Sequence, residues 1–419
     1  MNKPIIVMTL LMMSSSVVIL NHPAYAATSL AQLITIAIQQ NPALKAKKLA
    51  WQSSIQQYPQ AVALSDPSLT YNEAINPIET RLGPQERNLT LQQQLPYPGK
   101  RGLRGEIVKK DIAAAKIRYE QASRNLVVSV KKAFYEAAYL QQAISLSEQN
   151  KTILEKISQV ANTRYASNSS TLNDVAKAQS QYGQVSYDLQ LLRELLSTEK
   201  TRINTLLNRK PEHAFTVQQI RAAKKFNQPL ARLYKYAEAN EELKIAELVI
   251  KKSAIKKELA GYASLPDFKL GVQYSQIGES ETTGLARSGE DAIAVSFGVT
   301  IPLNHDKNKA IKHQAHLERL QAIEKKKSLI NELHNNVKGV FFKITNSQRL
   351  VTLYQQNLLP QAQHAKQIAE TEYRQNKGSI TRYLSTQATW LNFQLAYQRA
   401  TADFWKNLAE MEKLTGRKL

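Results

Sequence analysis

The chain has 419 residues, of which 56 are lysine or arginine and 34 are aspartate or glutamate, so its formal net charge is +22. A hydrophobic fraction of 43% is enough for a folded core and excludes wholesale disorder. The absence of cysteine excludes a disulfide scaffold, a thiol nucleophile and a cysteine-ligated metal site.

The first 26 residues have the pattern of a secretory signal peptide. Lys3 supplies the positive start, residues 5–20 form a short apolar run, and Ala24-Tyr25-Ala26 matches a small-x-small cleavage site. A transmembrane anchor is the alternative, but the uninterrupted apolar stretch is shorter than the ~20 residues that a spanning helix needs. We therefore expect export into a bacterial envelope. No later segment has a long uncharged apolar run, so we expect no membrane helix in the mature chain.

The positive charge is spread along the chain in short lysine runs. In an exported protein this distribution favours solvated helix faces, with a surface that attracts anions or lipid head groups as the alternative. Nucleic-acid binding has only the charge in its favour, so we expect no nucleic-acid partner.

The sequence contains an internal duplication. Residues 30–33 resemble residues 230–233, and residues 165–168 resemble residues 373–376 at an offset of 208. Two copies are too few for a solenoid and indicate a body built from two similar halves. We expect a first unit, a linker and a second unit over residues 27–209, 210–229 and 230–419.

Each unit is expected to contain a pair of strands. Apolar and polar residues alternate most clearly in the second unit, where Phe268, Leu270, Val272 and Tyr274 are separated by polar or small residues. Polar loops are expected to join the members of each pair, at residues 76–87 and 278–290. The expected strands cover residues 68–76, 87–95, 266–276 and 291–302.

Long helical hairpins are expected after each strand pair, over residues 101–209 and 305–417. Apolar and small residues recur there three and four apart, which is typical of coiled-coil packing. Sixty residues of helix span about 90 Å, so such helices must pack side by side. The expected hairpin tips are short and polar, and they contain Asn168, Ser169, Ser170, Asn376, Lys377 and Gly378.

Four strands with one polar face have open edges, which lipid does not tolerate. Three copies would pool twelve strands, enough for a membrane barrel, and strands of about 9–11 residues fit a bilayer. The edge of a soluble sandwich is the alternative. The strand–helix junctions are marked by Pro96, Pro98, Gly99 and Pro302, since proline lacks the ladder donor and glycine lets the chain swivel.

With the repeat, the tips and the junction Gln94 to Arg101, the chain resembles the outer membrane efflux protein family of TolC-like outer membrane factors. The resemblance implies a mainly α-helical homotrimer with a twelve-stranded barrel in the outer membrane and a helical barrel in the periplasm. It implies a passive duct without catalysis or cofactor, an inner-membrane pump of the RND or ABC type, and a periplasmic adaptor docked at the tips. The Pro-Gly-Lys-Arg sequence at residues 98–101 is most similar to the heavy-metal efflux branch.

The resemblance also implies a gate at the periplasmic end. Asp174 and Tyr373 match the family's gate aspartate and tyrosine, which a hydrogen bond would join. The alternative is a helix N-terminal aspartate and a packing tyrosine. Arg382 and Ser385 stand where members often carry carboxylates, so three copies of Arg382 would form a positive ring that favours anions.

Two further alternatives concern metal binding and the class of protein. His305, His313 and His316 are close enough in sequence to suggest a metal site, but without a third ligand type exposed polar histidines are favoured and no metal is expected. A periplasmic coiled-coil adaptor or scaffold would explain the helices but not the four alternating strands. Drug efflux, metal efflux and type I secretion share one architecture, so the sequence does not separate them.

Overall fold

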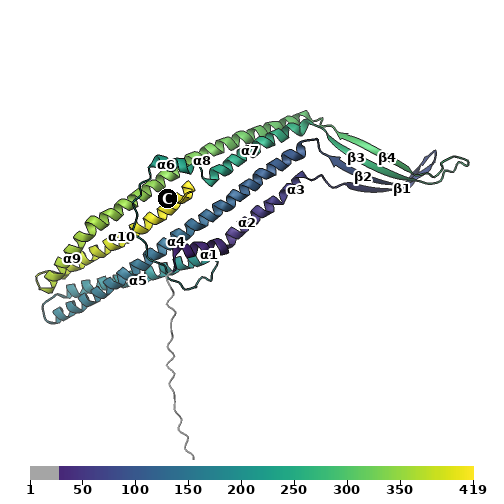
Figure 1. Cartoon of the computed structure of the whole chain (residues 1–419). Coiled ribbons are helices and arrows are strands. Elements are labelled where there is room, and N and C mark those ends of the chain that lie inside the picture. The colour runs from purple at the N-terminus through teal and green to yellow at the C-terminus, as the bar shows by residue number, and fades with distance from the viewer. Residues whose placement is uncertain (1–27) are drawn as a thin grey trace, which may run out of the picture.

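The computed structural model describes residues 28–419, and the signal peptide predicted for residues 1–26 lies outside the described residues. The molecule is elongated, with a β-sheet at one end, the tips of two helical hairpins at the other and long helices between them (Figure 1). This arrangement places both strand pairs together although about 190 residues separate them in the sequence.

The sheet has four antiparallel strands in the order β1-β2-β3-β4, so β1 and β4 are its open edges. The strands are β1 (Ser68–Thr80), β2 (Gly83–Leu95), β3 (Asp267–Ile277) and β4 (Ala292–Thr300). The loop predicted at residues 76–87 is wrong: β1 and β2 continue through it and leave a two-residue turn. A shift in register between Glu73 and Ile78 accommodates Pro77, because a bulge leaves a position without a ladder bond. The second predicted loop does separate β3 from β4.

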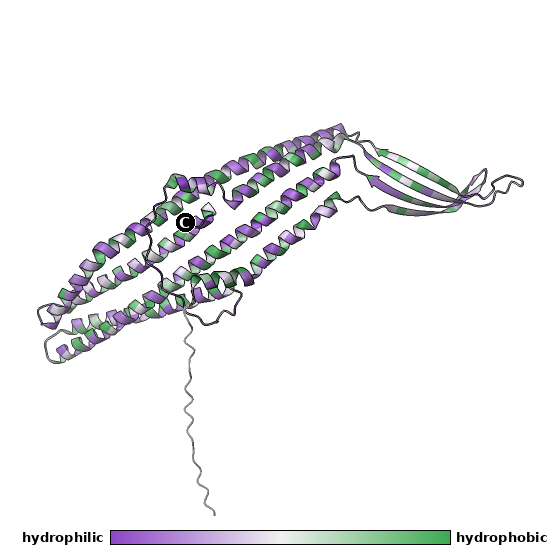
Figure 2. Ribbon diagram, in the orientation of Figure 1, coloured by the Kyte–Doolittle hydropathy of each residue, from purple (hydrophilic) through white to green (hydrophobic). Residues whose placement is uncertain are grey.

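One face of the sheet carries apolar rows that cross all four strands. Leu69, Leu91, Val272 and Val295 are paired in register and form one such row. Tyr71, Leu89, Tyr274 and Ile293 form the next. All eight side chains are more than 40% exposed. The row of residues between them points to the opposite face of the sheet. Its side chains are polar or small, and it consists of Thr70, Thr90, Gln273 and Ala294. Figure 2 shows the resulting alternation along each strand.

The helices of the first half are α1 (Leu30–Gln40), α2 (Pro42–Ile55), α3 (Gln57–Val62), α4 (Lys100–Ala166) and α5 (Leu172–Leu206). Those of the second half are α6 (Leu230–Ala237), α7 (Glu241–Gly261), α8 (His305–Leu353), α9 (Leu359–Arg374) and α10 (Ile380–Thr415). A 3-10 turn, η1 (Tyr262–Ser264), follows α7. No helix within residues 28–419 combines the length and the apolar character needed to cross a bilayer.

The first arm of the helical hairpin predicted over residues 305–417 is not one continuous helix in the structure. A π-helical turn, η2 (Tyr354–Leu358), separates α8 from α9, and Pro360 follows it at the start of α9. Proline lacks a backbone N–H and clashes with the preceding turn, and a π turn is one way to absorb that misfit. The sequence-based expectation was wrong because the apolar spacing continues on both sides of the break.

Three apolar clusters hold the helices together. One surrounds Phe134 on α4 and joins α1, α5 and residues 215–217. The second surrounds Phe404 on α10 and joins α6 and α8. The third lies near the tips and joins the two hairpins through Val175, Tyr373 and Tyr383. The predicted linker, residues 210–229, is free of helices and contributes Phe226 to the second cluster.

Ion pairs reinforce the contact between α4 and α10. The Glu136 carboxylate accepts hydrogen bonds from Arg399 at 2.7 and 2.8 Å and from Lys406 at 2.7 Å. Burial alone would raise the pKa of Glu136, but these two cations together hold it below its usual range. The ionised Glu136 carboxylate and its two cationic partners therefore stabilise the folded state.

We expect the change Glu136→Gln to destabilise the protein by roughly 1.5–3 kcal/mol at neutral pH, the range for hydrogen bonds to charged groups. Because the folded-state pKa is lowered, this contribution is present above the unfolded-state pKa, about 4.3, and is lost as the pH falls through the folded-state value. Thermal melting of the purified protein from pH 7 to pH 3.5 measures it, and the gap between variant and wild type should narrow on acidification. The control is Glu148→Gln, also on α4, which removes an exposed ion pair with Arg193 of α5 and should change the stability little. Equal losses of stability in the Glu136 and Glu148 variants would contradict this account.

Candidate functional site

The two hairpin tips, at the ends farthest from the sheet, have the same turn. Asn168 and Asn376 take positive φ angles of 54° and 60°, a conformation that asparagine tolerates better than most residues. The backbone N–H of Ser169 donates to the carbonyl of Arg164 at 2.7 Å, and that of Lys377 donates to the carbonyl of Glu372 at 2.9 Å. Of the predicted tip residues, Asn168, Ser169, Asn376 and Lys377 are exposed, and Ser170 and Gly378 are half-buried.

Asp174 caps α5 rather than bonding to Tyr373. Its carboxylate accepts hydrogen bonds from the backbone of Thr171 at 3.2 Å and from the hydroxyl of Ser170 at 3.1 Å. Burial alone would raise the pKa of Asp174, but these hydrogen bonds and nearby Lys177 hold it below its usual range. The predicted hydrogen bond to Tyr373 is therefore not formed within the chain, because the local cap already occupies the carboxylate.

Tyr373 is buried at the contact between the two hairpins, with 6% of its surface exposed. The Arg164 guanidinium lies 4.2 Å from the centre of its ring and donates to its carbonyl oxygen at 2.9 Å. Tyr383 packs beside it, with ring centres 5.7 Å apart. Burial raises the pKa of Tyr373, and it raises the pKa of Tyr383 to about 12. Both phenols therefore stay neutral near pH 7.

The contact between Arg164 and Tyr373 was not predicted from the sequence. The available signal was a cation in the last turn of a long helix, one residue before the copy of Tyr373 at position 165. Tyr165 itself is 47% exposed. The two copies of the tyrosine thus have different roles, and only the second packs between the hairpins.

Arg382 has an acidic partner within the chain. Its guanidinium lies 3.1 Å from the Glu372 carboxylate across the second tip. At the offset of 208, Glu372 corresponds to Arg164 and Arg382 corresponds to Asp174. The acidic and basic positions of the first repeat are therefore reversed in the second. The ring of three Arg382 charges stays a prediction, and within one chain Glu372 offsets part of each charge. Nothing in the sequence indicated this pair, because the two residues are ten positions apart and meet only where the helices fold back.

A groove between α5 and α10 lies beside the tips. It has a volume of about 630 Å³, and small or polar side chains line it, among them Ser180, Ser385 and Ala388. Lys177 bridges the two helices by donating to the Thr381 hydroxyl at 3.1 Å. Ser385 is exposed there and its hydroxyl is available to a partner chain.

The strand–helix junctions at the other end are built around Asp267, with β2 ending at Leu95 just before Pro96 and Pro98. The Asp267 carboxylate accepts from the backbone N–H of Tyr97 and from Lys100, both at 2.8 Å. At the second junction Asn304 caps α8, and Asn308 donates to the carbonyl of Pro302 at 3.3 Å. These bonds fix the sheet relative to the helices.

Gly99 is required at the first junction because its φ is +97° and an added Cβ would lie 3.0 Å from the Tyr262 hydroxyl. We expect Gly99→Ala to destabilise the protein by about 1–3 kcal/mol, the cost of a strained backbone. Gly102→Ala is the matched control, since that position is helical and open and alanine there should stabilise by about 0.5–1 kcal/mol. Melting temperatures of the two purified variants should shift in opposite directions. A shift in the same direction would show that the backbone at position 99 does not require glycine.

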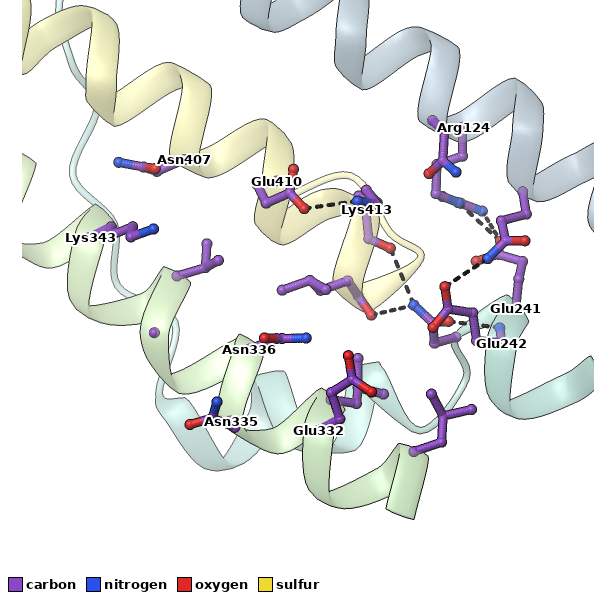
Figure 3. Close-up of a pocket in the computed structure, with 18 of the residues that line it drawn as sticks. Arg124, Glu241, Glu242, Glu332, Asn335, Asn336, Lys343, Asn407, Glu410 and Lys413 are labelled. Carbon is purple, nitrogen blue, oxygen red and sulfur yellow. Dashed lines mark hydrogen bonds and ion pairs between the residues drawn. The ribbon is translucent and has the colours of Figure 1, made fainter. Parts of the chain in front are cut away.

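A polar cavity of about 590 Å³ lies midway along the helices, among α4, α7, α8 and α10. Figure 3 shows Arg124 bonded to Glu241, at 2.6 and 3.0 Å, and Glu410 bonded to Lys413 at 3.0 Å. Four cationic and four acidic side chains line it, so its charge is balanced. These residues were not predicted, because the partners come from helices more than 100 residues apart.

Within residues 28–419 no three histidine, aspartate or glutamate side chains are grouped to hold a metal ion. His305 and His313 are exposed and His316 is half-buried. The cluster noted in the sequence therefore does not assemble a metal site.

The fold matches solved outer membrane channels at low sequence identity. A CusC structure aligns with a TM-score of 0.78 and 14% identity over 94% of this chain and 93% of that one. VceC of Vibrio cholerae aligns with 0.76 and 18% over 93% and 96%, and the open-state MtrE channel of Neisseria gonorrhoeae with 0.75 and 17% over 93% and 89%. None of the curated proteins matches the sequence. The architecture is thus that of TolC-like outer membrane channels.

The family model described as outer membrane efflux protein matches residues 33–209 and 233–417, so the chain belongs to the outer membrane efflux protein family. Its location is the outer membrane, and its role is that of an efflux channel. The two matched segments are the parts that contain the strand pairs and the helical hairpins.

Proposed function

We propose that this protein is the outer membrane duct of a tripartite efflux system. Three copies pool four strands each into a twelve-stranded barrel in the outer membrane, and their helices continue as a hollow barrel through the periplasm. Solutes move through it passively and no chemistry is catalysed.

The observation that carries the proposal is the sheet. It has two open edges and two exposed apolar rows on one face. An open edge costs several kcal/mol for each unsatisfied backbone group in lipid, so the sheet must close by pairing with other sheets. The polar row on its other face then meets water in the lumen.

The partners follow from the opposite end of the molecule. The exposed tips and the α5–α10 groove with Ser385 and Lys177 fit a periplasmic adaptor protein. An inner-membrane pump of the RND or ABC type would supply the energy that the duct lacks. Small molecules, either drugs or metal ions, are the proposed cargo, and a type I secretion system is the related alternative.

The periplasmic gate is proposed to centre on the contact between Arg164 and Tyr373, with Asp174 and Arg382 setting the local charge. The contact joins the two hairpins, so parting them requires breaking it. A docking adaptor is the natural source of that force.

The experiment is to express the full chain in a Gram-negative host and to fractionate its envelope. We expect an outer-membrane protein that resists salt washing, runs as a trimer and conducts in planar bilayers. A periplasmic coiled-coil adaptor or scaffold, the rival function, would appear in the soluble fraction and would not conduct. A soluble, monomeric product would refute the duct.

A further inference from the structure

A second cavity, nearer the sheet, has an unbalanced charge. It has a volume of about 380 Å³ and lies where α7 packs between α4 and α8. Five cationic side chains line it, against two acidic ones, and the cations are Lys110, Arg118, Lys252, Lys256 and Lys325. We call this cavity the basic pocket.

Only part of this positive charge is neutralised within the chain. Lys252 lies 2.6 and 2.7 Å from the two carboxylate oxygens of Asp111, so that pair is satisfied. Glu318, the other acid, accepts a hydrogen bond from Gln314. Within residues 28–419, Arg118, Lys256 and Lys325 make no ion pair or hydrogen bond. Three unpaired cations from three helices thus surround one cavity.

Helix geometry places the basic pocket on the face of the helical layer opposite the equatorial segment. The equatorial segment, residues 210–239, packs on α8 through His334 and Phe341, whose rings contact Tyr234 at 4.9 Å and Phe226 at 6.4 Å. Lys325 precedes His334 by nine residues, which is two and a half turns, so it points to the opposite face. In the proposed trimer the helices form a closed ring with the equatorial segment on its outside. The face of α8 that carries Lys325 then points into the lumen.

The span of the pocket supports the same assignment. Residues of α4 and α8 line it together, although α7 lies between these helices. In a curved layer of three helices, the side chains of the two flanking helices, here α4 and α8, approach each other on the concave side. α7 is also central in the layer, so the pocket is complete within a single copy and needs no neighbouring subunit.

We propose that the basic pocket is an anion-binding site on the inner wall of the duct, which takes phosphate- or sulfate-type groups of passing solutes. The inference rests on the proposed duct and, of the two cargo classes proposed for it, favours anionic small molecules over metal cations. Arginine and lysine side chains suit such groups because they donate charge-assisted hydrogen bonds. Three copies of the pocket would form a positive zone that concentrates anions in the lumen.

The polar cavity midway along the helices, which is farther from the sheet, differs from the basic pocket in its balance of charges. Both cavities lie on the same face of α8, since Lys343 follows His334 by nine residues. In the lower cavity Arg124, Lys132 and Lys413 are each paired with glutamate. We therefore expect anions to be attracted at the basic pocket, near the sheet, and not at the polar cavity.

The test compares two triple variants of the full-length protein. Arg118→Gln, Lys256→Gln and Lys325→Gln together remove the unpaired cations. The matched control is Lys116→Gln, Lys251→Gln and Lys327→Gln, which removes equal charge from the same helices. Lys116 and Lys327 lie two positions from Arg118 and Lys325, about 200° around the helix, and Lys251 lies five positions from Lys256, about 140° around the helix. Each control residue is paired with an exposed glutamate.

Two measurements are made with inorganic tripolyphosphate as the probe. Calorimetry on the detergent-purified protein should show binding to wild type and control, weakened about tenfold or more in the pocket variant. In planar bilayers tripolyphosphate should block wild-type current, and the pocket variant should lose this block and its preference for chloride over potassium. A charge-conserving variant, Arg118→Lys with Lys256→Arg and Lys325→Arg, should retain binding.

The outcomes separate this inference from the proposed function. Equal binding and block in the pocket variant and the wild type would overturn the anion site while leaving the duct intact. Equal weakening in both triple variants would also overturn it, because the effect would then come from net charge alone. Binding that depends on the pocket, in a wild type that forms no pore, would support the site and refute the duct.

Discussion

Replacing Val295 with arginine is expected to prevent stable insertion of the sheet into the outer membrane. Val295 lies in the middle of β4, is 74% exposed and belongs to an apolar row that crosses the sheet. An arginine facing lipid near the bilayer midplane costs about 2–4 kcal/mol, and three copies multiply that cost. The variant should be lost from the salt-washed outer-membrane fraction and should not assemble as a trimer.

The adjacent residue provides the matched control. Ala294 lies opposite Gln273 in the polar row, on the face assigned to the lumen, so Ala294→Arg should insert and assemble normally while altering conductance. Both substitutions add the same side chain to the same strand. Normal insertion of the Val295 variant, or equal loss of both, would show that the apolar rows do not face lipid.

The second large effect is expected at the gate, where Arg164→Ala should open the periplasmic mouth. The variant loses a cation–π contact with Tyr373 and a hydrogen bond to its carbonyl. Contacts of these kinds contribute about 0.5–2 and 1.5–3 kcal/mol, so about 2 kcal/mol per copy is a conservative sum. One to two kcal/mol changes an equilibrium about 5–30-fold. Single-channel recordings should show more frequent or larger openings.

Arg374→Ala is the control for the gate. Arg374 lies at the second tip, in the same helix α9 as Tyr373. It pairs with Glu370 at 2.7 Å, but its side chain is 77% exposed, and exposed pairs contribute little. Arg164→Lys separates charge from shape, because lysine cannot lie flat on the ring as a guanidinium does. Conductance unchanged in Arg164→Ala, or changed equally in Arg374→Ala, would remove Arg164 from the gate.

The fold was predictable where a short stretch of sequence carries a periodic signal. Alternation along β3 and β4 and the three-and-four spacing along α4 gave element types whose bounds agree with the structure to within a few residues. Asn168 and Asn376 marked the turns because asparagine tolerates positive φ. Pro96 and Pro302 follow the strands because proline cannot extend a ladder.

The turn between β1 and β2 was misread for a physical reason. Residues 76–87 are rich in polar residues and proline, which is the usual composition of a loop. In the structure they extend both strands, because backbone pairing such as Ile78 with Gln85 does not depend on an apolar face. Strand pairing far from the apolar rows leaves no alternation to detect.

By itself the sequence determined the element types, the two-fold repeat and the alternating faces of the sheet, since all of these depend on spacings of a few residues. Only the tertiary structure decided which charged groups meet across the helices: Arg164 with Tyr373, Arg124 with Glu241, and Lys252 with Asp111. It also decided which charges stay unpaired, as at the basic pocket. Side-chain pairing between segments about 100–200 residues apart depends on how the helices pack, and no local periodicity encodes that.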